Sequence, residues 1–76
     1  MSIRKSYAVC GLGRYGTAVA KELVENGADV IAVDSNMELV EEASAFIPYC
    51  KCADITDPDV IERLGIANVD VVIIAM

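Results

Sequence analysis

Four short apolar runs, rich in β-branched residues, recur along the 76-residue chain. They predict strands at Tyr7–Cys10, Asp29–Val33, about Tyr49–Ala53 and Val71–Ala75. Runs of this length without alternating polar residues are typical of strands in a sheet that is covered on both faces. The run at 71–75 is apolar throughout, so we expect this strand to lie in the centre of the sheet.

Between the runs, apolar residues recur at the spacing of helices that bury one face. The predicted helices cover residues 14–26, from 35 or 36 to about 46, and from 56 or 57 to 65. Gly27 supplies the left-handed residue that closes the first helix. Either Ser35 or Asn36 caps the second helix, and Glu38 lies at the capping-box distance from Ser35. The helix boundaries therefore rest on capping chemistry as well as on periodicity.

Strands that alternate with helices through short loops require right-handed crossovers, which produce a parallel sheet. The chain is therefore predicted to be an α/β protein of the Rossmann type, ordered β-α-β-α-β-α-β, with strand order 3-2-1-4. No helix is predicted after the fourth strand, which ends beside Met76. We expect residues 1–76 to form a single domain whose C-terminal part is missing.

Three glycines, Gly11, Gly13 and Gly16, stand between the first predicted strand and the first predicted helix, in the pattern G-x-G-x-x-G. Gly11 permits a tight turn, Gly13 lets the backbone approach a diphosphate, and Gly16 lets the helix pack close to the strand. The free N–H groups at the start of the helix attract phosphate oxygens. This context favours a nucleotide's phosphate site over a turn that binds nothing.

Two acidic residues follow strands of the predicted sheet. A carboxylate at Asp34 accepts hydrogen bonds from ribose hydroxyls and repels a 2′-phosphate, which favours NAD(H), ATP, ADP or AMP over NADP. Asp54 directly follows the third strand, where it is expected to read the amino edge of adenine. The alternatives are a solvated loop acid at Asp34 and a helix-capping acid at Asp54.

Arg14 adds a positive charge to the glycine pattern. Its guanidinium can bind phosphate oxygens through two hydrogen bonds, or it can point to solvent or pair with an acid. Tyr15 is expected to pack or to contact a neighbouring molecule. The candidate cofactor-binding residues are Gly11, Leu12, Gly13, Arg14, Tyr15, Gly16, Asp34, Ser35, Ala53, Asp54, Ile55 and Ala75.

The charge and composition of the chain limit the classes of molecule that it can bind. Twelve acidic and six basic residues give a net charge of −6, which argues against nucleic acid and anionic membrane surfaces. The N-terminus lacks the pattern of a signal peptide, and the apolar run at residues 69–76 is too short to span a bilayer. We therefore expect a cytoplasmic protein without direct membrane insertion. With 55% hydrophobic residues in so short a chain, part of the surface is expected to be an interface.

Groups for catalysis or metal binding are missing from the sequence. There is no histidine and no P-loop lysine motif, so we expect a domain that binds a nucleotide without converting it. Cys10, Cys50 and Cys52 are expected to be free thiols. Alternation in a strand places Cys50 and Cys52 on one face, which favours core packing over metal or redox chemistry.

Three segments, GLGRYG at 11–16, DSN at 34–36 and ADITD at 53–57, give the chain a family resemblance. It resembles the N-terminal nucleotide-binding domain of the Trk/Ktr potassium-uptake regulatory proteins, the RCK or TrkA-N domain. The resemblance covers essentially the whole chain. One departure is Leu39, because some members carry a lysine near the start of the second helix.

The resemblance implies a sensor peripheral to the inner face of the cell membrane, docked on a membrane-embedded potassium transporter or channel. Members of this family assemble through dimers into octameric rings and bind NAD(H), ATP or ADP, whose identity changes pore opening. By the same resemblance, the three glycines hold phosphates, Asp34 holds the ribose, and Asp54 lies by the adenine. Arg14 would contact the terminal phosphate of ATP.

Two other functions stay open at this point. The chain is alternatively the cofactor-binding half of an NAD-dependent oxidoreductase, with its catalytic residues in a later segment. It is also compatible with a nucleotide-binding fragment that has no partner. Arg14 and the absence of catalytic groups favour the sensor over the enzyme.

Overall fold

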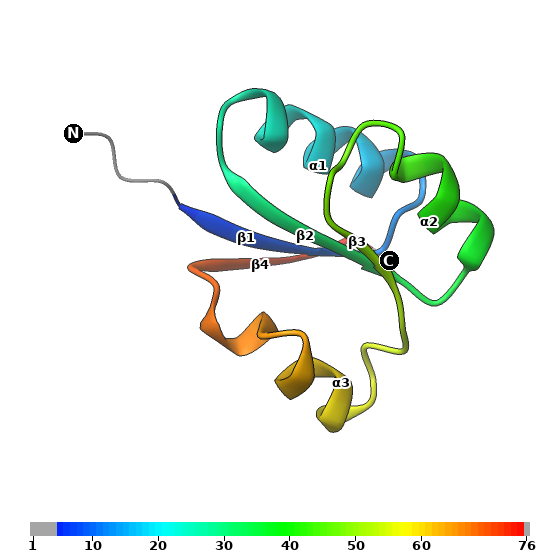
Figure 1. The fold of residues 1–76 in the computed structure, drawn as a ribbon, viewed down its shortest axis with the longest axis vertical. Helices are drawn as coiled ribbons and strands as arrows, with labels where there is room; N and C mark the ends of the chain where they lie inside the picture. The colour runs from blue at the N-terminus through cyan, green and yellow to red at the C-terminus, as the bar shows by residue number, and fades with distance from the viewer. Residues whose placement is uncertain (1–4, 76) are drawn as a thin grey trace.

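The computed structural model describes residues 5–75 and shows a four-stranded parallel sheet in the predicted order β3-β2-β1-β4 (Figure 1). The elements are β1 (Ser6–Cys10), α1 (Arg14–Glu25), β2 (Asp29–Asp34), α2 (Met37–Ala43), β3 (Cys50–Cys52), α3 (Pro58–Arg63), the 3₁₀ helix η1 (Ile66–Asn68) and β4 (Val71–Ile74). Residues 1–4 and Met76, which the predicted domain includes, lie outside the described residues.

Helices cover the sheet on both faces. α1 and α2 lie on one face, and α3 with η1 lies on the other (Figure 1). Because successive side chains of a strand point to opposite faces, neighbouring residues of β1 enter different cores. Val9 packs with Leu12 and Ala20 on the α1 side, whereas Ala8 packs with Ile66 on the α3 side. β1 and β2 therefore lie between two apolar layers.

The helix ends differ in detail from the predicted boundaries. Asn36, and not Ser35, caps α2, since its side-chain oxygen accepts from the Glu38 N–H at 2.9 Å. α2 ends at Ala43, before the predicted end near Phe46. The chain turns there because the Phe46 N–H donates to the Ala43 carbonyl at 3.0 Å, a tighter closure than a helix makes. α1 ends at Glu25, one residue before the predicted end, and Gly27 has the predicted left-handed conformation, with a φ of 84°.

The prediction that the fourth strand is central is wrong for the described residues. β4 pairs with β1 at the edge of the sheet, opposite β3. Val72 and Ile74 are 45% and 61% exposed. The core on the α3 side is built on β1 and β2, so these two side chains lie beyond its cover. An apolar run indicates a strand, but it does not reveal where the covering helices lie.

The cysteines are free thiols, as predicted, but their burial differs. Cys10 is buried and Cys50 is half-buried, and burial raises the pKa of both thiols. Core packing is the wrong prediction for Cys52, which is exposed. β3 is the second edge strand, and Cys52 is its last residue, where the sheet gives way to the loop before α3.

Candidate functional site

The glycine pattern forms the turn from β1 into α1, at the carboxyl end of the sheet. Gly11 has a φ of 106°, a backbone conformation that favours glycine, and its N–H donates to the Val33 carbonyl at 2.8 Å. The turn is also braced by Thr17, whose hydroxyl donates to the Leu12 carbonyl at 2.9 Å. The sequence interpretation did not include Thr17. In the sequence, only the position of Thr17 in the first turn of the predicted helix indicates such a contact with the glycine turn.

Gly16 is the point of closest approach between α1 and the end of β1. A Cβ atom at this position would overlap the carbonyl oxygen of Gly11 and lie 2.9 Å from its carbonyl carbon. It would also lie 3.3 Å from the Cβ of Ala75, just beyond β4. Gly16 is therefore required by the protein's own packing, as the glycine pattern predicts.

Gly13 is in a different situation. It is the residue that precedes α1, with a φ of −69° and a ψ of −168°, which other residues adopt freely. A Cβ built on Gly13 would meet no atom of the described residues within 4 Å. α1 has no side-chain cap, and its first intrahelical bond is from the Thr17 N–H to the Gly13 carbonyl, at 2.9 Å. The start of α1 therefore has N–H groups without a side-chain cap, beside a residue without a side chain.

Asp34 joins two parts of this edge through its two carboxylate oxygens. Oδ2 accepts from the Leu12 N–H at 2.7 Å, and Oδ1 accepts from the Asn36 N–H at 2.8 Å. The carboxylate thus ties the glycine turn to the start of α2. Each oxygen keeps a further lone pair, so the same group can still accept from ribose hydroxyls. The sequence interpretation missed this structural role, although the short Asp-x-Asn spacing is typical of such a turn.

Half of the candidate residues meet in one hollow of about 120 Å³ at the carboxyl ends of β2 and β3. Predicted residues that line it are Gly11, Asp34, Ser35, Ala53, Asp54 and Ile55. Val33 and Thr56 complete the lining. Separate segments of the chain form this hollow because the carboxyl ends of parallel strands meet at one edge.

The Asp54 carboxylate lies at this hollow with its charge stabilised. Its Oδ1 accepts from the Thr56 hydroxyl at 2.6 Å and from the Thr56 N–H at 2.9 Å. These hydrogen bonds hold the pKa of Asp54 below its usual value. The cap of α3 is Asp57, whose side chain accepts from the Asp59 N–H at 2.9 Å. Asp54 is therefore not the N-cap of α3, and it stays available as an acceptor.

The other candidates lie around the start of α1. Leu12 is buried beneath the turn, and Ala75 lies beside Gly16. Arg14 is exposed. Tyr15 is 70% exposed on a different side of α1, in a shallow hollow with Val19. Tyr15 is thus set apart from the hollow that contains Asp34 and Asp54.

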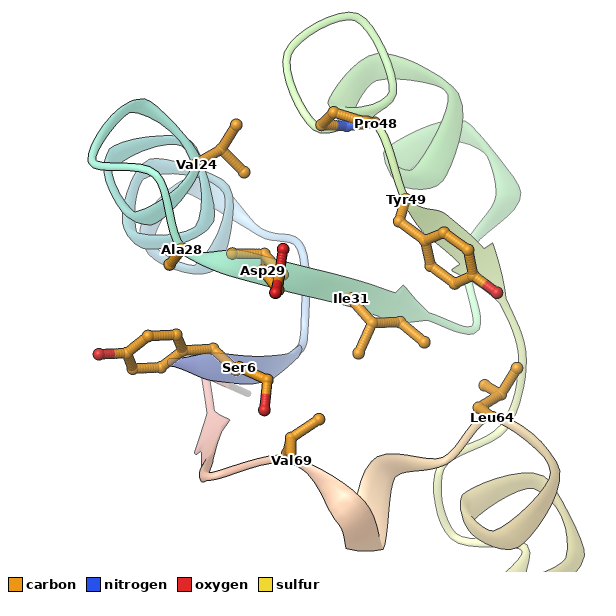
Figure 2. A pocket seen from close by; sticks show the side chains of 11 residues that line it. Ser6, Val24, Ala28, Asp29, Ile31, Pro48, Tyr49, Leu64 and Val69 are labelled. Atoms are coloured by element: carbon orange, nitrogen blue, oxygen red, sulfur yellow. The ribbon is translucent and has the colours of Figure 1, made fainter. Parts of the chain in front are cut away.

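A hollow of about 400 Å³ lies at the opposite end of the sheet, where β1 and β2 begin (Figure 2). Val24 of α1 and Leu64 at the end of α3 border it, together with Tyr49 before β3 and Val69 after η1. Ligands of open α/β sheets bind at the carboxyl ends of the strands. We therefore assign the candidate site to the smaller hollow beside the glycine turn.

Two features are absent from residues 5–75. No group of three or more acidic residues, cysteines or histidines is arranged to hold a metal ion. No helix in this range has the length and apolar character needed to cross a bilayer.

Residues 7–76 match the TrkA-N domain family. The chain belongs to this family. The resemblance drawn from the three sequence segments is thereby confirmed, and the match includes every candidate residue. TrkA-N domains are nucleotide-binding domains in general.

The TrkA-N chain is similar to proteins of potassium uptake systems. The Ktr system potassium uptake protein A of Vibrio alginolyticus is 42% identical over 72 residues, which are 95% of this chain and 33% of that protein. The Ktr system potassium uptake protein C of Bacillus subtilis is 38% identical over 74 residues, 97% of this chain and 34% of that protein. The chain spans about a third of the length of these curated relatives.

The close approach at Gly16 can be tested in the TrkA-N chain by a single methyl group. Gly16→Ala is expected to lower the free energy of unfolding by about 2–3 kcal/mol, because α1 must move away from the backbone of Gly11. Urea denaturation followed by circular dichroism measures the change. Gly13→Ala is the matched control and should shift stability by less than about 1 kcal/mol. Equal effects of the two substitutions would contradict the packing role.

Replacing Asp34 tests its structural role without any ligand. Asp34→Ala is expected to destabilise the protein by about 1–3 kcal/mol, because it leaves the N–H of buried Leu12 without its acceptor. Asp34→Asn keeps one acceptor oxygen and should have an intermediate effect. The control is Glu41→Gln, an exposed position on α2, where little change is expected. An Asp34→Ala variant as stable as the wild type in urea would refute the role.

Proposed function

We propose that this TrkA-N chain is the nucleotide-sensing part of a regulator of potassium uptake. It binds NAD(H) or an adenine nucleotide (ATP, ADP or AMP), and the bound ligand controls potassium flux through a membrane-embedded transporter or channel subunit. The proposed location is the inner face of the cell membrane, reached through that partner. The names of both relatives, as Ktr system potassium uptake proteins, support the potassium part of the proposal.

The main support for nucleotide binding is the open space at Gly13. Neither its backbone angles nor its neighbours require a glycine there, in contrast to Gly16. A missing side chain is useful at that point if a ligand approaches the backbone, and the uncapped start of α1 offers N–H groups to it. A diphosphate at this position fits both features.

The remaining groups suit the rest of a nucleotide. In the proposed complex, Asp34 accepts from the ribose hydroxyls with the lone pairs that Leu12 and Asn36 leave unused. Asp54, Ile55 and their neighbours in the hollow contact the adenine. Arg14 projects from the first residue of α1 and contacts the terminal phosphate of ATP. Tyr15, although it belongs to the candidate list, has no contact with the nucleotide in this proposal.

We favour a sensor over the oxidoreductase alternative. The relatives with 42% and 38% identity bear the names of uptake proteins, not of dehydrogenases. The sequence has no histidine, and the two acids of the hollow already accept backbone hydrogen bonds. These groups suit recognition of a ligand better than transfer of its protons.

Assembly with further copies of the chain is part of the proposal. A ring-forming sensor needs exposed apolar surface for its neighbours. Tyr15 on α1, and Val72 and Ile74 on β4, are large apolar side chains that the described residues leave exposed. A dimer that assembles further into a ring would use such surface.

The proposed function as a whole predicts a retained ligand and a transport phenotype. Mass spectrometry of the purified protein should find NAD(H) or an adenine nucleotide. A full-length regulator that contains this segment should restore potassium uptake in bacteria that lack their own regulator. Absence of nucleotide binding at millimolar concentrations would refute the sensor, and unchanged uptake would refute the potassium role.

Arg14 is expected to distinguish ATP from ADP. In calorimetry, Arg14→Ala should weaken ATP binding by about tenfold, because a charged hydrogen bond to the last phosphate is lost. ADP binding should weaken much less. Arg63→Ala, on α3 and away from the glycine turn, is the control and should change neither affinity. Equal losses for ATP and ADP would argue against a role in counting phosphates.

A further inference from the structure

A further hollow, of about 470 Å³, lies between α1 and α2. Gly13 and Arg14 form one end of it, so it begins where the proposed diphosphate lies. Lys21 lines it from α1, and Glu42 and Phe46 line it from α2 and the turn that follows. The proposed roles of the candidate residues leave most of this space unused.

The charge of this hollow is opposite to that of the molecule. The chain has a net charge of −6 and only six basic residues. Two of them, Arg14 and Lys21, line this one hollow, against a single acid, Glu42. The hollow beside the glycine turn has the reverse balance, since Asp34 and Asp54 line it without a basic residue. A ligand that spans both hollows would therefore meet acceptors at one end and positive charge at the other.

Lys21 contributes part of this positive charge from the middle of α1. It follows Arg14 by two helical turns, about 10 Å along α1 and on nearly the same face. Both side chains line the same hollow, Arg14 at its Gly13 end and Lys21 further along α1. Its Nζ lies 4.6 Å from the centre of the Phe46 ring, a distance typical of a cation–π contact. Phe46 thus holds the ammonium at the border of the hollow.

We propose that the hollow between α1 and α2 receives the part of the phosphate chain that extends beyond a diphosphate. Lys21 is its second cationic contact after Arg14, and Phe46 is a positioning residue for Lys21. The inference rests on the proposed function, because it extends the same nucleotide site. The inference makes Lys21 a residue that determines specificity. The affinity for an adenine nucleotide then rises with its number of phosphates, because Arg14 and Lys21 of α1 both contact the phosphate chain.

The test compares AMP, ADP and ATP by calorimetry in EDTA, so that no divalent cation neutralises the phosphates. Lys21→Gln is expected to weaken ATP binding by about two- to fivefold, the range of an exposed charge contact. AMP binding should be unchanged, and the ATP effect should shrink at high salt. Phe46→Leu should weaken ATP binding in the same direction but less, because it removes only the ring that holds the lysine.

The matched control is Lys51→Gln. Lys51 also lies over an aromatic ring, with its Nζ 5.5 Å from the centre of Tyr49, but it belongs to β3 and does not line the hollow. Lys51→Gln should leave all three affinities unchanged. Three outcomes would overturn the inference and leave the proposed function standing. They are an equal loss of AMP and ATP affinity in Lys21→Gln, no loss of ATP affinity in Lys21→Gln, and the same loss of ATP affinity in Lys51→Gln. If the wild-type chain binds none of the three nucleotides, the proposed function falls together with it.

Discussion

The contact between the backbone of Gly11 and α1 at Gly16 is the constraint on which the rest of the carboxyl edge depends. No side chain fits between them, so the helix starts directly above the end of β1. Its uncapped N–H groups are thereby held beside the ends of β2 and β3, which contribute Asp34 and Asp54. Backbone atoms cannot yield as side chains do, which makes the arrangement rigid. The protein's own packing therefore fixes the geometry of the candidate site.

Asp34 shows how one residue can serve the fold and the site together. Its carboxylate connects the glycine turn to the start of α2, and the same oxygens face the hollow. A carboxylate that is fixed by two backbone donors loses little freedom when it accepts from a ribose. Loss of ligand affinity after its substitution would therefore combine direct and structural effects. Stability measured without ligand separates the two.

Much of the fold followed from local patterns, because periodicity, glycines and capping residues act within a few neighbouring positions. The order of elements, the sheet order and the left-handed Gly27 were predicted correctly. The predictions for β4 and Cys52 failed because burial depends on which helix covers a strand, and residue type alone does not encode that. The early end of α2 came from a turn closed by Phe46, which periodicity does not detect.

The sequence by itself determined the family, the parallel α/β order and the residue types of the glycine turn, since short-range patterns suffice for each. Tertiary structure decided which of those residues share a hollow. It separated Tyr15 from Asp34, distinguished a glycine needed for packing from one beside open space, and brought Lys21 near Phe46. Such neighbours are distant in the chain, and only the close packing of helices on the sheet brings them together.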